Sequence, residues 1–85
     1  MTSVYSTEYQ LVIKILRDAR IEKGITQAKL AEALGRPQSF IAKVENGERK
    51  LDVVEFAVIA RLLKVDAGAV IERIGGQNDE KPPSA

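Results

Sequence analysis

The chain contains 85 residues, which is enough for one compact domain, since domains usually run from about 50 to 250 residues. Its 45% hydrophobic and 29% charged residues are typical of a globular protein, and its net charge of +1 neither requires nor excludes a polyanionic partner. The sequence has no His and no Cys, which excludes Ser-His-Asp sites, disulfides and the common zinc sites, and no apolar run is long enough to span a membrane. We therefore expect a cytosolic protein that is not an enzyme and uses no cofactor or metal.

Five short helices are predicted in chain order, with no strand pattern between them. Apolar residues recur at helical spacing over residues 7–23, 27–34, 37–45, 53–63 and 67–74. The Gly75-Gly76 pair is expected to end the last helix, because glycine commonly stands just beyond a helix C-terminus. The prediction is therefore an all-α domain over residues 1–75, followed by a flexible polar tail over residues 76–85.

The second and third helices form a helix-turn-helix pattern at about residues 26–45. Thr26 is the expected N-cap of the second helix, as Asp52 is of the fourth, and Gly35 lies in the turn between the second and third helices. The positions that face the shared interface are small or apolar, namely Leu30, Ala31, Leu34, Ile41 and Val44. Close packing of these two helices leaves the opposite face of the third helix for another contact.

That opposite face carries Gln38, Ser39 and Lys43, with no acidic residue among them. On an arbitrary short helix such residues would simply face solvent. In this pattern they suit DNA, because an α-helix fills the major groove, Gln pairs with adenine and Lys donates to guanine acceptors. Ser39 is also short enough to let the helix approach the bases. We therefore predict that these side chains contact bases of double-stranded DNA.

Other residues are expected to contact the DNA backbone. Gln27 lies at the start of the second helix, where free N–H groups and the helix dipole attract phosphate. Arg36, Arg49 and Lys50 flank the third helix with positive charge, although such loop residues often have no partner. Phe40 has two open interpretations, core packing and partial exposure over the sugar-phosphate edge, of which we favour partial exposure.

The segment TQAKLAEALGRPQSFIAKVENGER resembles the helix-turn-helix of the XRE family, the Cro and phage-repressor type. The likeness runs from about residue 13 to residue 63 and implies a lambda-repressor-like fold. It implies that Gln27 holds a phosphate and supports Gln38, which reads a base, and that Ser39 and Lys43 also face bases.

The same resemblance implies two further features. The loop at Asn46 and Gly47 would offer backbone donors to a phosphate, and Arg20 would form a buried ion pair with Glu45. Pro37 departs from the family pattern, in which a hydroxyl residue often caps the recognition helix, and Phe40 is bulkier than the Ser of some members.

The expected function is that of a sequence-specific, double-stranded-DNA-binding transcriptional regulator. One recognition helix covers only a few base pairs, so a homodimer on a pseudo-palindromic operator is predicted. Its interface would use apolar residues near the last helix, namely Leu62, Val65, Val70, Ile71 and Ile74. The alternative is an antitoxin or adaptor that holds a partner protein on the same scaffold. No small-molecule ligand is evident.

Overall fold

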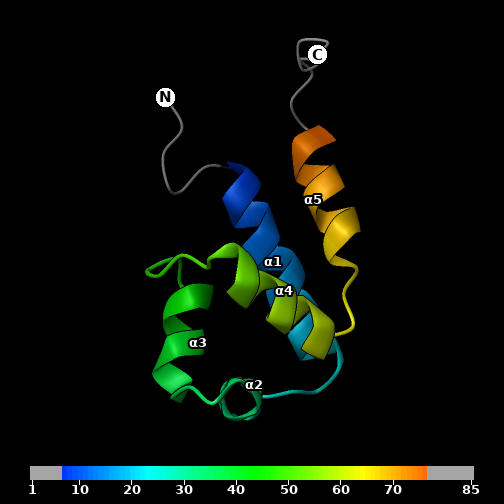
Figure 1. Ribbon diagram of the computed structural model, residues 1–85. Helices are drawn as coiled ribbons and strands as arrows, with labels where there is room; N and C mark the ends of the chain where they lie inside the picture. Colours follow the sequence, from blue (N-terminus) through cyan, green and yellow to red (C-terminus); the bar gives the residue numbers. More distant parts are fainter. Residues whose placement is uncertain (1–6, 77–85) are drawn as a thin grey trace.

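The computed structural model describes residues 7–76, which form five α-helices and no strand, so the all-α prediction is confirmed (Figure 1). The helices are α1 (Thr7–Glu22), α2 (Gln27–Leu34), α3 (Gln38–Glu45), α4 (Val53–Leu62) and α5 (Ala67–Gly76). None of these helices is long and apolar enough to cross a membrane. The predicted tail lies outside the described residues, except for Gly76.

Four helix ends differ from the prediction. α1 ends at Glu22 and α4 at Leu62, each one residue earlier than predicted. Pro37 has extended backbone angles (φ −69°, ψ 156°) and is the N-cap of α3, so this helix begins one residue later than predicted. The last helix does not stop at Ile74 but continues to Gly76. Glycine lowers helix stability by about 1 kcal/mol relative to alanine, which disfavours a helical Gly75 without forbidding it.

The predicted caps of α2 and α4 are present. The Thr26 Oγ1 atom accepts a hydrogen bond from the backbone N–H of Lys29 at 3.0 Å. Asp52 and Glu55 form a reciprocal capping box, because the Asp52 side chain accepts from the Glu55 N–H at 2.7 Å and the Glu55 side chain accepts from the Asp52 N–H at 3.0 Å. Both α2 and α4 therefore begin where a side chain satisfies a free N–H group.

The turn between α2 and α3 depends on Gly35. Its φ of 69° is left-handed, a conformation that side-chain-bearing residues rarely adopt. This conformation lets the backbone N–H of Arg36 donate to the carbonyl of Ala31 at 2.9 Å and so closes the end of α2. The chain then enters α3 after only Arg36 and Pro37.

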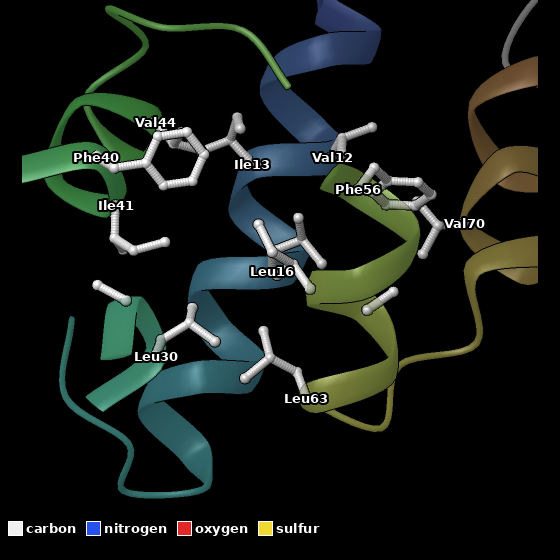
Figure 2. Packing of buried hydrophobic residues seen from close by; sticks show 13 residues of the cluster. Val12, Ile13, Leu16, Leu30, Phe40, Ile41, Val44, Phe56, Leu63 and Val70 are labelled. Carbon is white, nitrogen blue, oxygen red and sulfur yellow. The ribbon is translucent and has the colours of Figure 1, made fainter. Parts of the chain in front are cut away.

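The core is a cluster of mostly aliphatic side chains to which all five helices contribute (Figure 2). Ile41 of α3 and Leu63, just after α4, have the largest fully buried side chains among the described residues. Ala31 of α2 is also buried, and its small side chain allows α3 to approach closely. α3 and α5 lie on opposite sides of the domain (Figure 1), so a partner bound to one of them leaves the other free.

Candidate nucleic-acid interface

α3 has one face in the core and one face in solvent. Ile41 and Val44 are buried, and Figure 2 shows both pointing inward. Gln38, Ser39 and Lys43, the predicted base-contacting residues, are all exposed. The structure therefore places these three side chains on one accessible face that carries amide, hydroxyl and ammonium groups.

An ion pair connects α1 to the end of α3. The Arg20 Nε atom lies 2.7 Å from Glu45 Oε2, and Arg20 Nη2 lies 3.0 Å from Glu45 Oε1. Arg20 Nη1 also donates to the carbonyl of Ile25 at 2.7 Å. Both charged side chains are about nine-tenths buried, with 11% and 10% of their surface exposed. The ion pair that the family resemblance implies is therefore present, as a bidentate and largely desolvated contact.

This ion pair also orients two glutamines. Gln27 Nε2 donates to Glu45 Oε1 at 2.9 Å, and Gln38 Nε2 donates to Gln27 Oε1 at 3.4 Å. An ionised carboxylate only accepts hydrogen bonds, so Gln27 must present its NH₂ group to Glu45 and its oxygen to Gln38. Gln38 then keeps one N–H and its carbonyl oxygen free, which is the donor and acceptor pair that adenine requires in the major groove.

Two predicted phosphate contacts, Arg36 and Arg49, have protein partners. Arg36 Nη2 lies 3.1 Å from Glu55 Oε2, while Arg49 Nη1 and Nη2 lie 3.1 and 3.2 Å from the two oxygens of the same carboxylate. Both guanidinium groups also lie over the ring of Phe40, at 4.5 and 4.6 Å from its centroid. Both arginine side chains are still about two-fifths exposed.

The expectation that Phe40 is partly exposed is wrong. Its side chain is only 7% exposed and belongs to the core cluster. The physical reason is that the guanidinium groups of Arg36 and Arg49 cover the ring, because cations are attracted to an aromatic face. The ring therefore cannot lie over a sugar-phosphate edge.

The Glu55 carboxylate is stabilised in its charged form. The backbone N–H of Asp52 has the largest effect in holding its pKa below the usual value of 4.5, followed by the hydrogen bond from Arg49. Burial raises this pKa, but its effect is smaller than that of either hydrogen bond. Glu55 is therefore a permanent negative charge between two arginines near neutral pH.

The loop after α3 is fixed to α1 through Tyr9. The Tyr9 hydroxyl accepts from the backbone N–H of Leu51 at 3.1 Å and donates to the carbonyl of Arg49 at 3.4 Å. Asn46 and Lys50, two more predicted backbone contacts, are exposed on this loop. Both therefore remain available to a ligand.

The predicted dimer residues do not all face outward. Val70 is 5% exposed and lies in the core, so its assignment to an interface is wrong: it covers the domain's own apolar residues. Val65 and Ile74 are partly buried against the same core. Ile71, which is 50% exposed, and Leu62, which is 38% exposed, are accessible.

Sequence reasoning does not identify Tyr9 or Glu55 as part of this surface. The Asp-x-x-Glu spacing of residues 52–55 marks Glu55 as a helix-capping residue. Its contacts with Arg36 and Arg49 depend on how α3 and α4 pack, which no local pattern encodes. Tyr9 likewise reaches a loop about 40 residues away along the chain.

Comparison with known proteins agrees with this geometry. A helix-turn-helix family model matches residues 16–69. A search of curated protein sequences finds no significant match. Among solved structures, an XRE-family-like protein from Pseudomonas syringae pv. tomato str. DC3000 is 44% identical to this chain, with a TM-score of 0.76. The match covers 84% of this chain and 87% of that protein.

The restriction-modification controller protein C.Esp1396I, solved as a tetramer in complex with its natural 35-base-pair operator, is also similar. It is 25% identical with a TM-score of 0.69, over 84% of this chain and 93% of its own. A point mutant of that controller is 26% identical with a TM-score of 0.70, over 91% of this chain and 94% of its own.

The family match spans more than half of the chain and includes the whole α2–α3 unit. The exposed polar face of α3 lies within it. The chain belongs to the XRE family of helix-turn-helix proteins and is a DNA-binding transcriptional regulator.

Proposed function

We propose that the protein acts as a homodimer that reads a pseudo-palindromic operator, with α3 of each copy in the major groove. The observation that carries this proposal is the exposed face of Gln38, Ser39 and Lys43, in which the Gln38 amide is oriented by Gln27. Gln38 is suited to adenine and Lys43 to guanine, and Ser39 is short enough for close approach. An oriented amide binds its base more tightly than a free one, because less side-chain freedom is lost on binding.

Backbone contacts complete the proposed complex. Gln27 lies at the start of α2, and the exposed residues Asn46 and Lys50 follow α3 in the chain. Arg36 and Arg49 add positive charge at one place beside α3, where both pair with Glu55. Contacts of this kind fix the register of the protein on DNA without reading sequence.

Exposed apolar residues support the proposed dimer. Besides Ile71 and Leu62, Val53 at the start of α4 is also exposed. An apolar hollow of about 210 Å³ between the start of α4 and α5 is lined in part by Val53, Ile71 and Ile74. A second copy on this side would leave α3 free, because α3 and α5 lie on opposite sides of the domain. The antitoxin or adaptor alternative is not favoured, since the similar controller protein was solved on operator DNA.

The test is selection of bound duplexes from a random DNA pool, followed by affinity measurements with Gln38→Ala and Lys43→Ala. Each variant is expected to lose preference at one position of the half-site, at a cost of about 1–3 kcal/mol for a good bidentate contact. Selected half-sites should recur about 34 Å apart, one DNA turn. Sedimentation provides the independent check of the dimer. Unchanged preferences in both variants would refute the proposed reading face.

A further inference from the structure

We propose that Glu55 is a specificity-determining residue of the DNA-binding surface, although it lies on α4 and not on the helix-turn-helix. Glu55 draws the guanidinium groups of Arg36 and Arg49, which come from the turn before α3 and the loop after it, to one carboxylate, and this limits how freely the two cations follow DNA phosphates. The inference rests on the proposed function, and it assigns a role to a residue that faces no base.

The geometry shows one carboxylate shared by two cations. Arg49 approaches both Glu55 oxygens, at 3.1 and 3.2 Å, and Arg36 approaches one of them at 3.1 Å. Arg36 lies in the turn before α3, and Arg49 lies in the loop after it. The Glu55 side chain is only 15% exposed, so this carboxylate is better shielded from solvent than those of ordinary surface ion pairs.

The ring of Phe40 fixes the same two cations from a second direction. Each guanidinium carbon lies within 4.6 Å of the ring centroid. Arg49 has a third partner, because its Nη1 donates to the carbonyl of Lys50 at 2.8 Å. Each arginine is thus held by a carboxylate and by an aromatic face while about two-fifths of its side chain remains in solvent.

This arrangement affects two kinds of DNA binding differently. Sequence-independent binding depends on how many phosphates are neutralised, and the cluster of Arg36, Arg49 and Glu55 has a formal charge of +1 instead of the +2 of two free arginines. Sequence-specific binding depends on register, and two cations held together on one carboxylate meet the DNA backbone in one position only. Glu55 therefore lowers affinity for arbitrary DNA and keeps affinity for the correct site.

The experiment uses Glu55→Gln in the full chain. Glutamine retains an oxygen for the capping box with Asp52, so α4 keeps its N-terminal cap. Affinities are measured by fluorescence anisotropy for a duplex selected from the random pool and for a mixed-sequence duplex of the same length, over a range of salt concentrations. Circular dichroism confirms that the variant is folded.

Two freed arginines should add about one phosphate contact on mixed-sequence DNA. The log-log salt slope should then steepen by about 0.9, and affinity at 0.1 M salt should rise by at most about eightfold. Affinity for the selected duplex should rise less or fall, so the ratio of the two affinities should drop at least about threefold.

Glu48→Gln is the matched control. It makes the same change in net charge next to α3, and Glu48 takes part in none of the ion pairs seen within residues 7–76. It should change both affinities by one common factor and leave their ratio unaltered. If Glu55→Gln also leaves the ratio unaltered while the unmodified protein discriminates the two duplexes, the role of Glu55 is refuted and the proposed function stands. If the unmodified protein binds neither duplex at low salt, the proposed function fails and the inference with it.

A second variant covers the case in which Glu55→Gln does not fold. Arg36→Gln changes a side chain that is 43% exposed and should not unfold the domain. It should weaken binding to the selected duplex more than binding to mixed-sequence DNA. Lys29→Gln, at an exposed position on α2, should weaken both alike. An unchanged affinity ratio in Arg36→Gln overturns the inference on its own.

Discussion

Replacing Glu45 by alanine should destabilise the protein strongly. The variant removes an acceptor that receives two hydrogen bonds from Arg20 and one from Gln27. Arg20 is 11% exposed and would keep only its contact with the carbonyl of Ile25, so a largely desolvated positive charge would lose its counter-ion. Breaking a buried ion pair by removing one partner costs about 3–5 kcal/mol. Because Arg20 keeps its hydrogen bond to the Ile25 carbonyl, we expect the loss in unfolding free energy to lie near the lower end of this range, at about 3 kcal/mol.

Thermal unfolding followed by circular dichroism measures this effect. For a domain of 60–100 residues, each 1 kcal/mol lowers Tm by about 4–8 °C, so the expected decrease is about 12 °C or more. Glu48→Ala is the control, because it removes the same charge from an exposed position and should change stability by less than about 0.5 kcal/mol. A Glu45→Ala midpoint within about 4 °C of the unmodified protein would show that the two charges are solvated and apart, and the reasoning would be refuted.

Three further outcomes are expected. Thr26→Ala removes the oxygen that accepts from the Lys29 N–H and should cost about 1 kcal/mol in urea unfolding; an unchanged midpoint would contradict the capping role. Gly35→Ala meets no atom within 4 Å, so its cost should be that of the left-handed backbone alone, about 1 kcal/mol, and a loss above about 3 kcal/mol would point to a clash instead. The pKa of Glu55 is lower in the folded state than its usual 4.5, so its contribution to stability is present above that pH and is lost as the pH falls through the folded value; Glu55→Gln should flatten this part of a stability-pH curve.

Local patterns were sufficient to predict most of the fold. The spacing of apolar residues located the five helices, and Thr26 and Asp52 marked two of their starts correctly. The helix-turn-helix could also be predicted from the sequence. The turn at Gly35 and the contrast between buried Ile41 and exposed Gln38 are properties of a short continuous segment. The errors at the ends of α1, α4 and α5 and at the start of α3 are differences of one or two residues.

The errors in the candidate site have one physical origin. Whether Phe40 is exposed depends on Arg36 and Arg49, which reach it from opposite ends of α3, and on a carboxylate of α4 that holds them. Whether Val70 faces a partner or its own core depends on how α5 packs against α1 and α4. Both outcomes are set by contacts between distant segments, and periodicity within one helix carries no information about them.

The hydrogen bond between Gln38 and Gln27 has a consequence for redesign of this protein. Ser39 and Lys43 are exposed, and within residues 7–76 their side chains form no hydrogen bond or ion pair, so libraries randomised at these two positions should yield folded variants with new binding preferences. Position 38 is different, because a replacement without an N–H group deprives the Gln27 side-chain carbonyl of its donor while Glu45 still holds the Gln27 amide nitrogen in place. New specificities at position 38 should therefore be sought by varying residues 27 and 38 as a pair.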